Sequence, residues 1–328
     1  MVDVAREAGV SLKTVSRVVN DEPGVRPETA RRVRRVIARL GFQRNDSASQ
    51  LRRGSSASIG LVVEDLGNPF YSQLAAAVER EARREGHLLI SASAEGDPER
   101  EAALVAALVA RQVDGLVVVP AGLGSAGHRT WGAPMVYVDR PGVDPSTDTV
   151  LSDNTGGVRS AVEHLAARGH HRIGFLGDDV AYWTAQERER AFRATHADLR
   201  LDGLPAVAMG PHTAESLAAV LGAWTAAPEP VTALVTGNNR VTVAMLRAIR
   251  ALGRPLAFVG YDDFELADLL EPTVTVVHQD PAAMGQAAAL ALFARIKGDD
   301  GPPRSVTVPT HLIVRESSGL RVPTGKTA

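Results

Sequence analysis

Residues 3–20 read DVAREAGVSLKTVSRVVN, and this stretch decides how the first part of the chain folds. Its apolar residues lie on one face of a short helix over residues 2–8, and Gly9 can adopt the left-handed conformation that ends a helix. Ser11 then suits the N-cap of a second helix over residues 12–19, because its hydroxyl can accept a free backbone N–H. Two short helices joined by a glycine-containing turn form a helix-turn-helix.

A third helix is predicted over residues 27–40. Pro27 suits its first position, and Gly41 suits its end. Its apolar stripe has the i, i+3, i+4, i+7 spacing of a helix that buries one face, and the stripe consists of Val33, Val36, Ile37 and Leu40. Three such helices can enclose one small core, so the sequence predicts a first domain over residues 1–44.

The charge is divided unevenly along the chain. Residues 1–56 hold 12 Lys and Arg against 6 Asp and Glu, a net charge of +6, whereas residues 57–328 hold 24 against 32, a net charge of −8. A basic segment on an acidic body favours a polyanionic partner for that segment alone. The alternative is a solvated basic helix, because four arginines cluster at residues 31–35.

In a helix-turn-helix the second helix enters the major groove of DNA with its N-terminus first. Leu12, Lys13 and Arg17 would then face base edges, since Lys and Arg can donate to guanine and Leu can contact a thymine methyl. Hydroxyl groups on the same helix suit phosphates. The full set expected to contact DNA is Ser11, Leu12, Lys13, Thr14, Ser16, Arg17 and Asn20. A helical bundle without a nucleic acid partner is the alternative.

From Ser58 onward, apolar strands alternate with amphipathic helices. The predicted strands form two series, 59–64, 87–93, 115–120 and 135–138, then 172–176, 206–209, 233–236 and 256–260. The helices between them are predicted at 69–85, 98–111, 155–168, 187–197, 215–226 and 240–252. This alternation predicts an α/β body of two lobes, each a doubly wound parallel sheet. Ligands of such sheets bind beyond the carboxyl ends of the strands, so we expect a ligand in the cleft between the lobes.

The composition argues against a disulfide-bonded, a metal-binding and a membrane-spanning protein. The 328 residues are 45% hydrophobic and include no cysteine, so two or three domains with sizeable cores are expected, without disulfides or thiolate metal sites. No apolar run reaches the roughly 18 residues of a membrane span, and the start lacks the layout of a signal peptide. The nine histidines lack metal-ligand spacing. We therefore expect a cytoplasmic protein without a bound metal or cofactor.

Two other functions are alternatives to a ligand-responsive DNA-binding protein. A cytoplasmic α/β enzyme acting on a sugar or nucleoside would need a nucleophile with its base or a cofactor fingerprint. Residues 122–127 match G-x-G-x-x-G, but too few residues separate them from the next strand for the helix that a dinucleotide site requires. A transport binding protein would need a signal peptide and would have no use for a basic head. We therefore expect no catalytic residues.

The run 3–20 resembles the DNA-binding headpiece of the LacI family, which includes the lactose and purine repressors. The family continues with a helix like residues 27–40 and a hinge segment that residues 45–51 resemble. The resemblance implies that this hinge folds into a helix when a dimer meets its operator. It also implies that Leu51 wedges into the minor groove beside the small Ala48 and kinks the duplex, at a cost of a few kcal/mol that added contacts offset.

The body also resembles that family, whose body is similar to a periplasmic sugar-binding protein. The motifs that carry the resemblance are NPFY at 68–71, VDRP at 138–141, DN at 153–154, GHHRI at 169–173 and VGYDD at 259–263. The family's chain crosses between lobes more than once. The implied organisation is a hinge over 45–56, an effector-binding body over 57–320 and a tail over 321–328. Within the body, the N-lobe takes about 57–155 and 281–309, and the C-lobe about 156–280 and 310–320.

The resemblance also implies an effector site between the lobes. It falls on the loop after the first strand, on the ends of later strands and on the segment before Phe192. Some family members place an effector-binding arginine in that segment, where this chain has Gln186, an uncharged amide that argues against an anionic effector. The implied site residues are Asn68, Phe70, Tyr71, Asp139, Trp183, Gln186, Arg188, Asn238 and Asp262. An aromatic ring, an amide and a carboxylate suit a sugar, with a nucleoside as the alternative.

The function that follows is a transcriptional repressor whose operator affinity depends on a small-molecule effector. One headpiece reads only a few base pairs, so we expect a homodimer, or a tetramer, on a pseudo-palindromic operator. The effector must bind the DNA-competent and DNA-incompetent states unequally, because otherwise it changes nothing.

Overall fold

The computed structural model describes residues 1–42, 56–122, 132–253 and 255–319. The chain divides into two compact units, Met1–Ser56 and Ala57–Ala328. Ala48 and Leu51, the glycine-rich run after Gly122 and the tail 321–328 lie outside the described residues.

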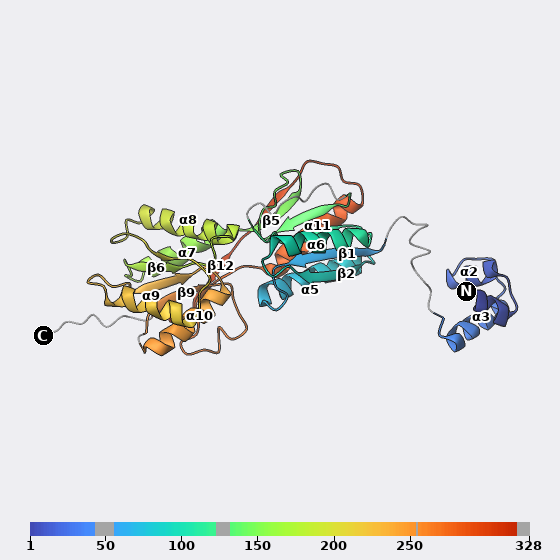
Figure 1. Cartoon of the computed structure of the whole chain (residues 1–328), viewed down its shortest axis with the longest axis horizontal. Helices are drawn as coiled ribbons and strands as arrows, with labels where there is room; N and C mark the ends of the chain where they lie inside the picture. Colours follow the sequence, from blue (N-terminus) through green and yellow to red (C-terminus); the bar gives the residue numbers. More distant parts are fainter. Residues whose placement is uncertain (43–55, 123–131, 254, 320–328) are drawn as a thin grey trace. The chain divides into compact units, whose positions relative to one another are not determined.

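The first unit consists of α1 (Val2–Ala8), α2 (Leu12–Val19) and α3 (Pro27–Leu40), as the sequence predicted (Figure 1). Gly9 ends α1 with φ 62°, a left-handed conformation that costs glycine little. The Ser11 hydroxyl caps α2 by accepting the N–H of Thr14 at 3.2 Å. The three helices enclose a core of Val4, Ala5, Ala8, Val15, Val18, Val33 and Val36.

The second unit contains two six-stranded sheets. The N-lobe sheet has the order β11-β5-β4-β3-β1-β2, and every pairing is parallel. Its strands are β1 (Ser58–Val63), β2 (Leu88–Ser93), β3 (Leu116–Val118), β4 (Met135–Val138), β5 (Asp148–Ser152) and β11 (Ser305–Val308). A parallel sheet needs a covered surface on both sides.

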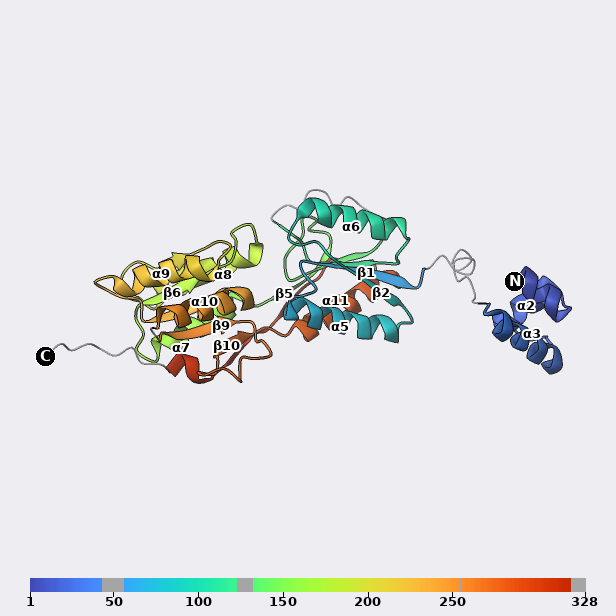
Figure 2. The same ribbon diagram turned by 60° about the horizontal axis from the view of Figure 1, so that its bottom comes forward.

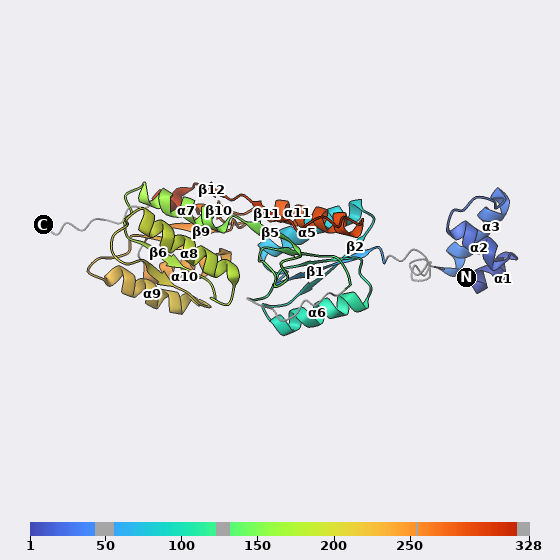
Figure 3. The same ribbon diagram turned by 90° about the horizontal axis from the view of Figure 1, so that it is seen from above.

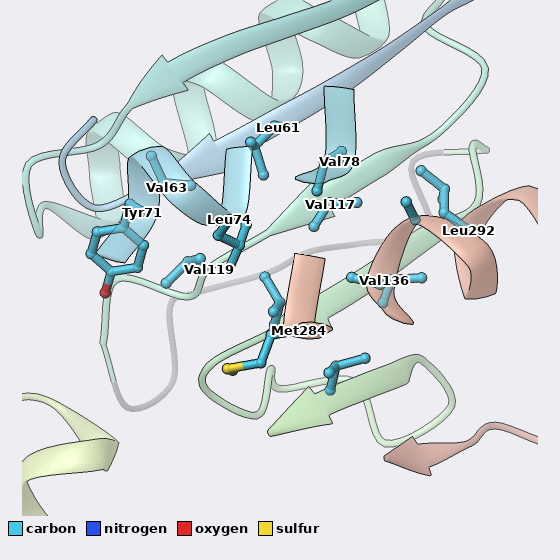
Figure 4. Close-up of a cluster of buried hydrophobic side chains, with 14 of the residues drawn as sticks. Leu61, Val63, Tyr71, Leu74, Val78, Val117, Val119, Val136, Met284 and Leu292 are labelled. Atoms are coloured by element: carbon cyan, nitrogen blue, oxygen red, sulfur yellow. The ribbon is translucent and has the colours of Figure 1, made fainter. Parts of the chain in front are cut away.

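Helices cover both faces of this sheet (Figure 3). One face carries α5 (Pro69–Arg84) and α11 (Pro281–Ile296), and the other carries α6 (Pro98–Ala110). Figure 4 shows the first of these interfaces, where Leu74 and Met284 meet strand residues such as Val136, while the Tyr71 hydroxyl points out of the cluster. Tyr71 is therefore anchored in the core but presents its oxygen at the edge.

The C-lobe repeats this plan. Its sheet has the order β12-β10-β9-β8-β6-β7, parallel except that β12 runs antiparallel to β10. The strands are β6 (Ile173–Leu176), β7 (Ala206–Ala208), β8 (Ala233–Thr236), β9 (Ala257–Tyr261), β10 (Val276–His278) and β12 (His311–Ile313). One face packs against α7 (Asn154–Ala166) and α8 (Trp183–Asp198), the other against α9 (Ala214–Ala226) and α10 (Asn239–Leu252) (Figure 1). Figure 2 gives a second view of the same lobe, turned by 60°. A short 3-10 helix, Glu316–Gly319, follows β12.

The chain passes between the lobes after β5, after β10 and after β11. The predicted fold class, a helix-turn-helix unit with a two-lobed α/β body, is confirmed. No helix in the described ranges has the length and apolar character needed to span a bilayer.

The sequence prediction differs from the structure mainly near the crossings. It did not name β5, β10, β11, β12 or α11 as elements. These strands are only three to five residues long, too short for a clear alternation, and α11 is apolar on most of its surface because it is rich in alanine. Helix α8 also begins at Trp183, four residues earlier than predicted, since its first turn lacks an apolar stripe.

Candidate functional site

The carboxyl ends of strands from both lobes border a small cavity of about 30 Å³. Its walls combine acidic, basic and amide groups. The side chains that line it are Glu64, Asn68, Phe70, Tyr71, Asp139, Arg140, Asp178, Thr184, Arg188, Asn238, Arg240, Asp262 and Gln279. We call this cavity the cleft.

Two aspartates occupy equivalent positions in the two lobes. Asp139 follows β4 and Asp262 follows β9, and the backbone of both is left-handed, with φ 70° and 64°. Aspartate tolerates this conformation better than most residues because its short polar side chain can hydrogen-bond locally. Asp262 accepts the N–H of Asn239 at the start of α10 at 3.2 Å and an amide N–H of Gln279. Both carboxylates are thus fixed, and both are buried.

A charged network fills the N-lobe side of the cleft. Arg140 donates to the Glu64 carboxylate, to the Pro120 carbonyl at 3.0 Å and to the Tyr71 hydroxyl at 3.1 Å. That hydroxyl lies 3.2 Å from Oδ2 of Asp139, to which it donates. Arg140 and Glu64 are almost fully buried, so removing their charges from water is costly, and their pairing offsets part of that cost.

The electrostatics of the cleft are visible in the pKa of Asp139. Burial raises the pKa of this carboxyl above its ordinary value, opposed by the charges of Arg140 and Arg188 and reinforced by the carboxylates of Asp262 and Glu64. Asp139 therefore senses charge from both lobes, which means that the two strand-end carboxylates lie near one another.

Arg188 is the central cation on the C-lobe side. Its Nε donates to Oδ1 of Asn154 at 2.7 Å, and its Nη1 donates to the Gly237 carbonyl at 2.6 Å. The guanidinium lies 3.9 Å from the centre of the Tyr261 ring, a cation–π contact. Among the described residues no carboxylate forms an ion pair with Arg188, and its Nη2 donates to none of them. A buried guanidinium with free donors can bind acceptor atoms of a ligand.

Helix N-termini from both lobes border the cleft. Asn68 caps α5 by accepting the N–H of Phe70 at 3.1 Å. Asn238 caps α10 by accepting the N–H of Val241 at 2.9 Å, and its amide donates to Asp178. The side-chain oxygens of both asparagines already accept the capping N–H groups. Each side chain therefore has fewer free donors and acceptors for a ligand.

The structure brings together seven of the nine side chains that the sequence predicted for this site: Asn68, Phe70, Tyr71, Asp139, Arg188, Asn238 and Asp262. Trp183 and Gln186 do not line the cleft. Thr184 and Arg188 are one helical turn apart and lie on the face of α8 that lines the cleft. The Gln186 amide instead donates a hydrogen bond to the Val180 carbonyl at 2.7 Å. The amide at 186 thus says little about the charge of a ligand.

Six lining residues were missed from the sequence. They are Glu64, Arg140, Asp178, Thr184, Arg240 and Gln279. Glu64 directly follows β1, a strand that the sequence analysis did predict, so the rule that ligands bind at carboxyl ends of strands could have found it. Gln279 follows β10, which was not recognised as a strand, and no sequence signal marked it.

The exposed side of α2 forms a second candidate site. Ser11, Leu12 and Lys13 are exposed, with Leu12 at 50% despite its apolar side chain. In the described part of the chain, the side chains of Lys13 and Arg17 hydrogen-bond to no other residue. Thr14, Ser16, Arg17 and Asn20 are half-buried, and Asn20 donates to Ser16 at 3.4 Å. Free cations beside an exposed leucine fit a surface that reads DNA bases.

A helix-turn-helix with free cations, joined to a two-lobed body with a polar cleft, defines a DNA-binding regulator that responds to a ligand. Residues 1–45 match the family model "Bacterial regulatory proteins, lacI family", and residues 162–318 match "Periplasmic binding protein-like domain". The transcriptional regulator PtxS of Pseudomonas putida is 32% identical over 96% of this chain and 95% of that protein. The transcriptional repressor PurR of Aliivibrio fischeri is 28% identical over 96% and 97%.

Solved structures agree over the same length. The Lac repressor dimer bound to operator and the anti-inducer ONPF matches with a TM-score of 0.82 at 26% identity, over 96% of this chain and 98% of that one. The complex of the transcriptional regulator CelR with cellobiose matches with a TM-score of 0.70 at 30% identity, over 96% and 98%. The chain belongs to the LacI family of bacterial transcriptional regulators.

Proposed function

We propose that the cleft binds a neutral, hydroxyl-rich effector, a sugar, and that this binding controls the affinity of the headpiece for an operator. The observation that carries the proposal is the composition of the cleft. Four carboxylates and three guanidiniums line it together with amides, so its charge is nearly balanced and it is rich in both donors and acceptors. A sugar offers hydroxyls that donate and accept at once.

A nucleoside fits this cleft less well. Base recognition would use a ring free to stack on, but Phe70 is only 7% exposed and packs edge-on against Tyr71 with ring centres 5.1 Å apart. Tyr71 is itself part of the N-lobe core. The similar proteins named for sugars, CelR in complex with cellobiose and the ribose operon repressor of Halalkalibacterium halodurans, also support a sugar.

The test of the effector site begins with the natural operator, found by footprinting genomic DNA with the purified protein. Neutral sugars, sugar acids and nucleosides are then screened for a change in operator affinity by fluorescence anisotropy. The site variant is Asp262→Asn, because asparagine tolerates the left-handed backbone at this position, whereas alanine adds strain of about 1–2 kcal/mol.

Asp262→Asn should bind the operator normally and lose the response to the active compound. The matched control is Asp202→Asn, an exposed C-lobe aspartate outside the cleft. A normal response in Asp262→Asn would refute the assignment of this cleft, and a response only to nucleosides would refute the ligand class.

For the headpiece, we propose that Lys13 and Arg17 read bases and that Ser11, Thr14, Ser16 and Asn20 fix its position on phosphates. Leu12 would then contact a thymine methyl. Lys13→Ala or Arg17→Ala should weaken operator binding by about 1–3 kcal/mol and relax base preference in each half-site. Equal losses on operator and random DNA would instead place these side chains on the phosphate backbone.

We further propose that the chain acts as a homodimer in the bacterial cytoplasm and has no enzymatic activity of its own. A groove of about 600 Å³ on the C-lobe runs beside α10, and the apolar side chains that line it include Leu246, Phe264 and Leu266. Leu266 is 55% exposed. Exposed apolar patches of this kind mark protein interfaces, and the similar Lac repressor was solved as a dimer.

The dimer proposal is tested by sedimentation of Leu266→Glu, which should shift the protein towards monomer. Leu204→Glu is the control, since Leu204 is 92% exposed and lies outside this groove. An unchanged dimer in Leu266→Glu would remove this groove from the interface.

A further inference from the structure

A salt link joins the two lobes at the rim of the cleft. Arg240, the second residue of α10 in the C-lobe, donates through Nη2 to Asp65 in the loop after β1 of the N-lobe. Its Nη1 lies 3.5 Å from Oε1 of Glu64. Beside this link, the amides of Asn68 and Asn239 exchange hydrogen bonds of 2.8 and 3.4 Å.

These contacts join groups that are far apart in the sequence, with separations of 171 to 176 residues. They connect the N-terminus of α5 to the N-terminus of α10. They therefore form only when the lobes approach and must break when the lobes separate.

The cleft behind this link is too small for a sugar. Its volume of about 30 Å³ is a small fraction of the roughly 300–1,000 Å³ that pockets for small organic ligands hold. A ligand can enter only after the side chains that close the cleft have moved apart.

We propose that Arg240, through Asp65 and Glu64, is a latch that holds the effector cleft shut in the unliganded protein, so that effector binding and the latch exclude each other. This inference rests on the proposed effector site, but it concerns the free protein and can be tested without any effector.

The charge pattern explains why a latch is needed. The carboxylates of Glu64, Asp139 and Asp262 meet in the cleft from both lobes, and like charges brought together resist closure. Arg240 adds a cation from the C-lobe to a carboxylate of the N-lobe that already binds Arg140. Without that cation, the carboxylates of the two lobes repel each other more strongly, and a larger fraction of molecules is open.

The exposed fractions of the paired side chains determine how far the loss of the latch should shift the equilibrium between open and closed molecules. The side chains of Arg240 and Asp65 are 50% and 39% exposed, and ion pairs of this kind shift an equilibrium by about 1.4- to 5-fold. Glu64 is 8% exposed, which places the expected shift in the upper part of that range. Arg240→Gln should raise the ratio of open to closed molecules about two- to fivefold.

The experiment measures lobe separation in the full-length protein. The chain has no cysteine, so spin labels attach only at introduced positions, Glu99→Cys in α6 and Leu204→Cys on the C-lobe, both exposed. Double electron–electron resonance then gives the distribution of distances between the labels. Arg240→Gln should increase the fraction of longer distances, and Asp65→Asn should do the same.

The matched control is Arg159→Gln. Arg159 is also 50% exposed, but it pairs within the C-lobe with Glu163 at 2.8 Å, so its loss should leave the distances unchanged. In the double variant, Asp65→Asn should add little to Arg240→Gln, because the two changes remove one interaction.

Identical distance distributions for the wild type, Arg240→Gln and Asp65→Asn would overturn the latch, and so would fully additive effects of the two substitutions. Circular dichroism and thermal unfolding establish that each variant is folded. If Arg240→Gln fails to fold, Asp65→Asn alone decides the matter, because it leaves α10 intact. None of these outcomes depends on whether the effector is a sugar.

Discussion

Gly285 provides a quantitative test of the packing between α5 and α11. A Cβ atom placed at this position would lie 2.5 Å from the Leu74 carbonyl oxygen and 3.0 Å from the Ala77 Cβ. Ordinary van der Waals contact begins at 3.4 Å, so Gly285→Ala must push the two helices apart by 3.4 − 2.5 = 0.9 Å. The obstacle is backbone, which cannot turn aside as a flexible side chain can.

Two terms decide the net effect of Gly285→Ala. Overpacking a tight core costs about 1–3 kcal/mol, while replacing glycine by alanine within a helix contributes about 1 kcal/mol in the opposite direction. We therefore expect a destabilisation of about 1 kcal/mol, which lowers the melting temperature by a few degrees.

Gly222→Ala is the matched control. Gly222 lies within α9, and a Cβ there would meet nothing within 4 Å, so only the helix propensity acts and stability should rise by up to about 1 kcal/mol. Urea unfolding and differential scanning calorimetry measure both variants. If Gly285→Ala were as stable as Gly222→Ala, the close approach of α11 to α5 would be wrong.

Three further predictions concern the core and the cleft. Val15→Ala, at a fully buried position, should destabilise the headpiece by about 1–3 kcal/mol, seen as faster hydrogen exchange of α2 in the full-length chain; unchanged exchange would contradict its core position. The folded-state pKa of Asp139 is raised. The wild type should therefore gain stability relative to Asp139→Asn as the pH falls through that pKa towards the ordinary value of ~3.9. A stability difference that stays constant in urea titrations from pH 7 to 4 would be inconsistent with the raised pKa. Arg188→Lys should lower the melting temperature, because lysine cannot contact Asn154 and Gly237 and also stack on Tyr261, and Arg193→Lys on the exposed side of α8 is the control.

The headpiece could be predicted almost completely from the sequence. Its signals are local, such as Ser11 as a cap, Gly9 and Gly41 as helix ends, and a stripe of valines, and each acts within a few residues of the element it defines. Strands β1 to β4 and β6 to β9 of the body were found for a similar reason, because buried parallel strands form short apolar runs.

The cleft was predicted only in part, because its geometry depends on contacts between distant segments. Arg188 binds Asn154 and Gly237, which lie 34 and 49 residues away, and nothing near Arg188 in the sequence indicates these partners. The start of α8 was placed four residues late, so residues 183–186 were treated as a loop. Without a helix over these residues, the sequence analysis could not assign which of their side chains share the face of Arg188.

The left-handed backbone at Asp139 and Asp262 limits how the specificity of this protein can change. Only glycine, asparagine and aspartate adopt that conformation routinely, so few substitutions are open at these two positions without a backbone penalty. New ligand preferences would therefore arise more readily at neighbouring positions with ordinary backbone, such as Asp178, Thr184 and Gln279. A library designed to retarget the regulator should keep the two aspartates and vary their surroundings.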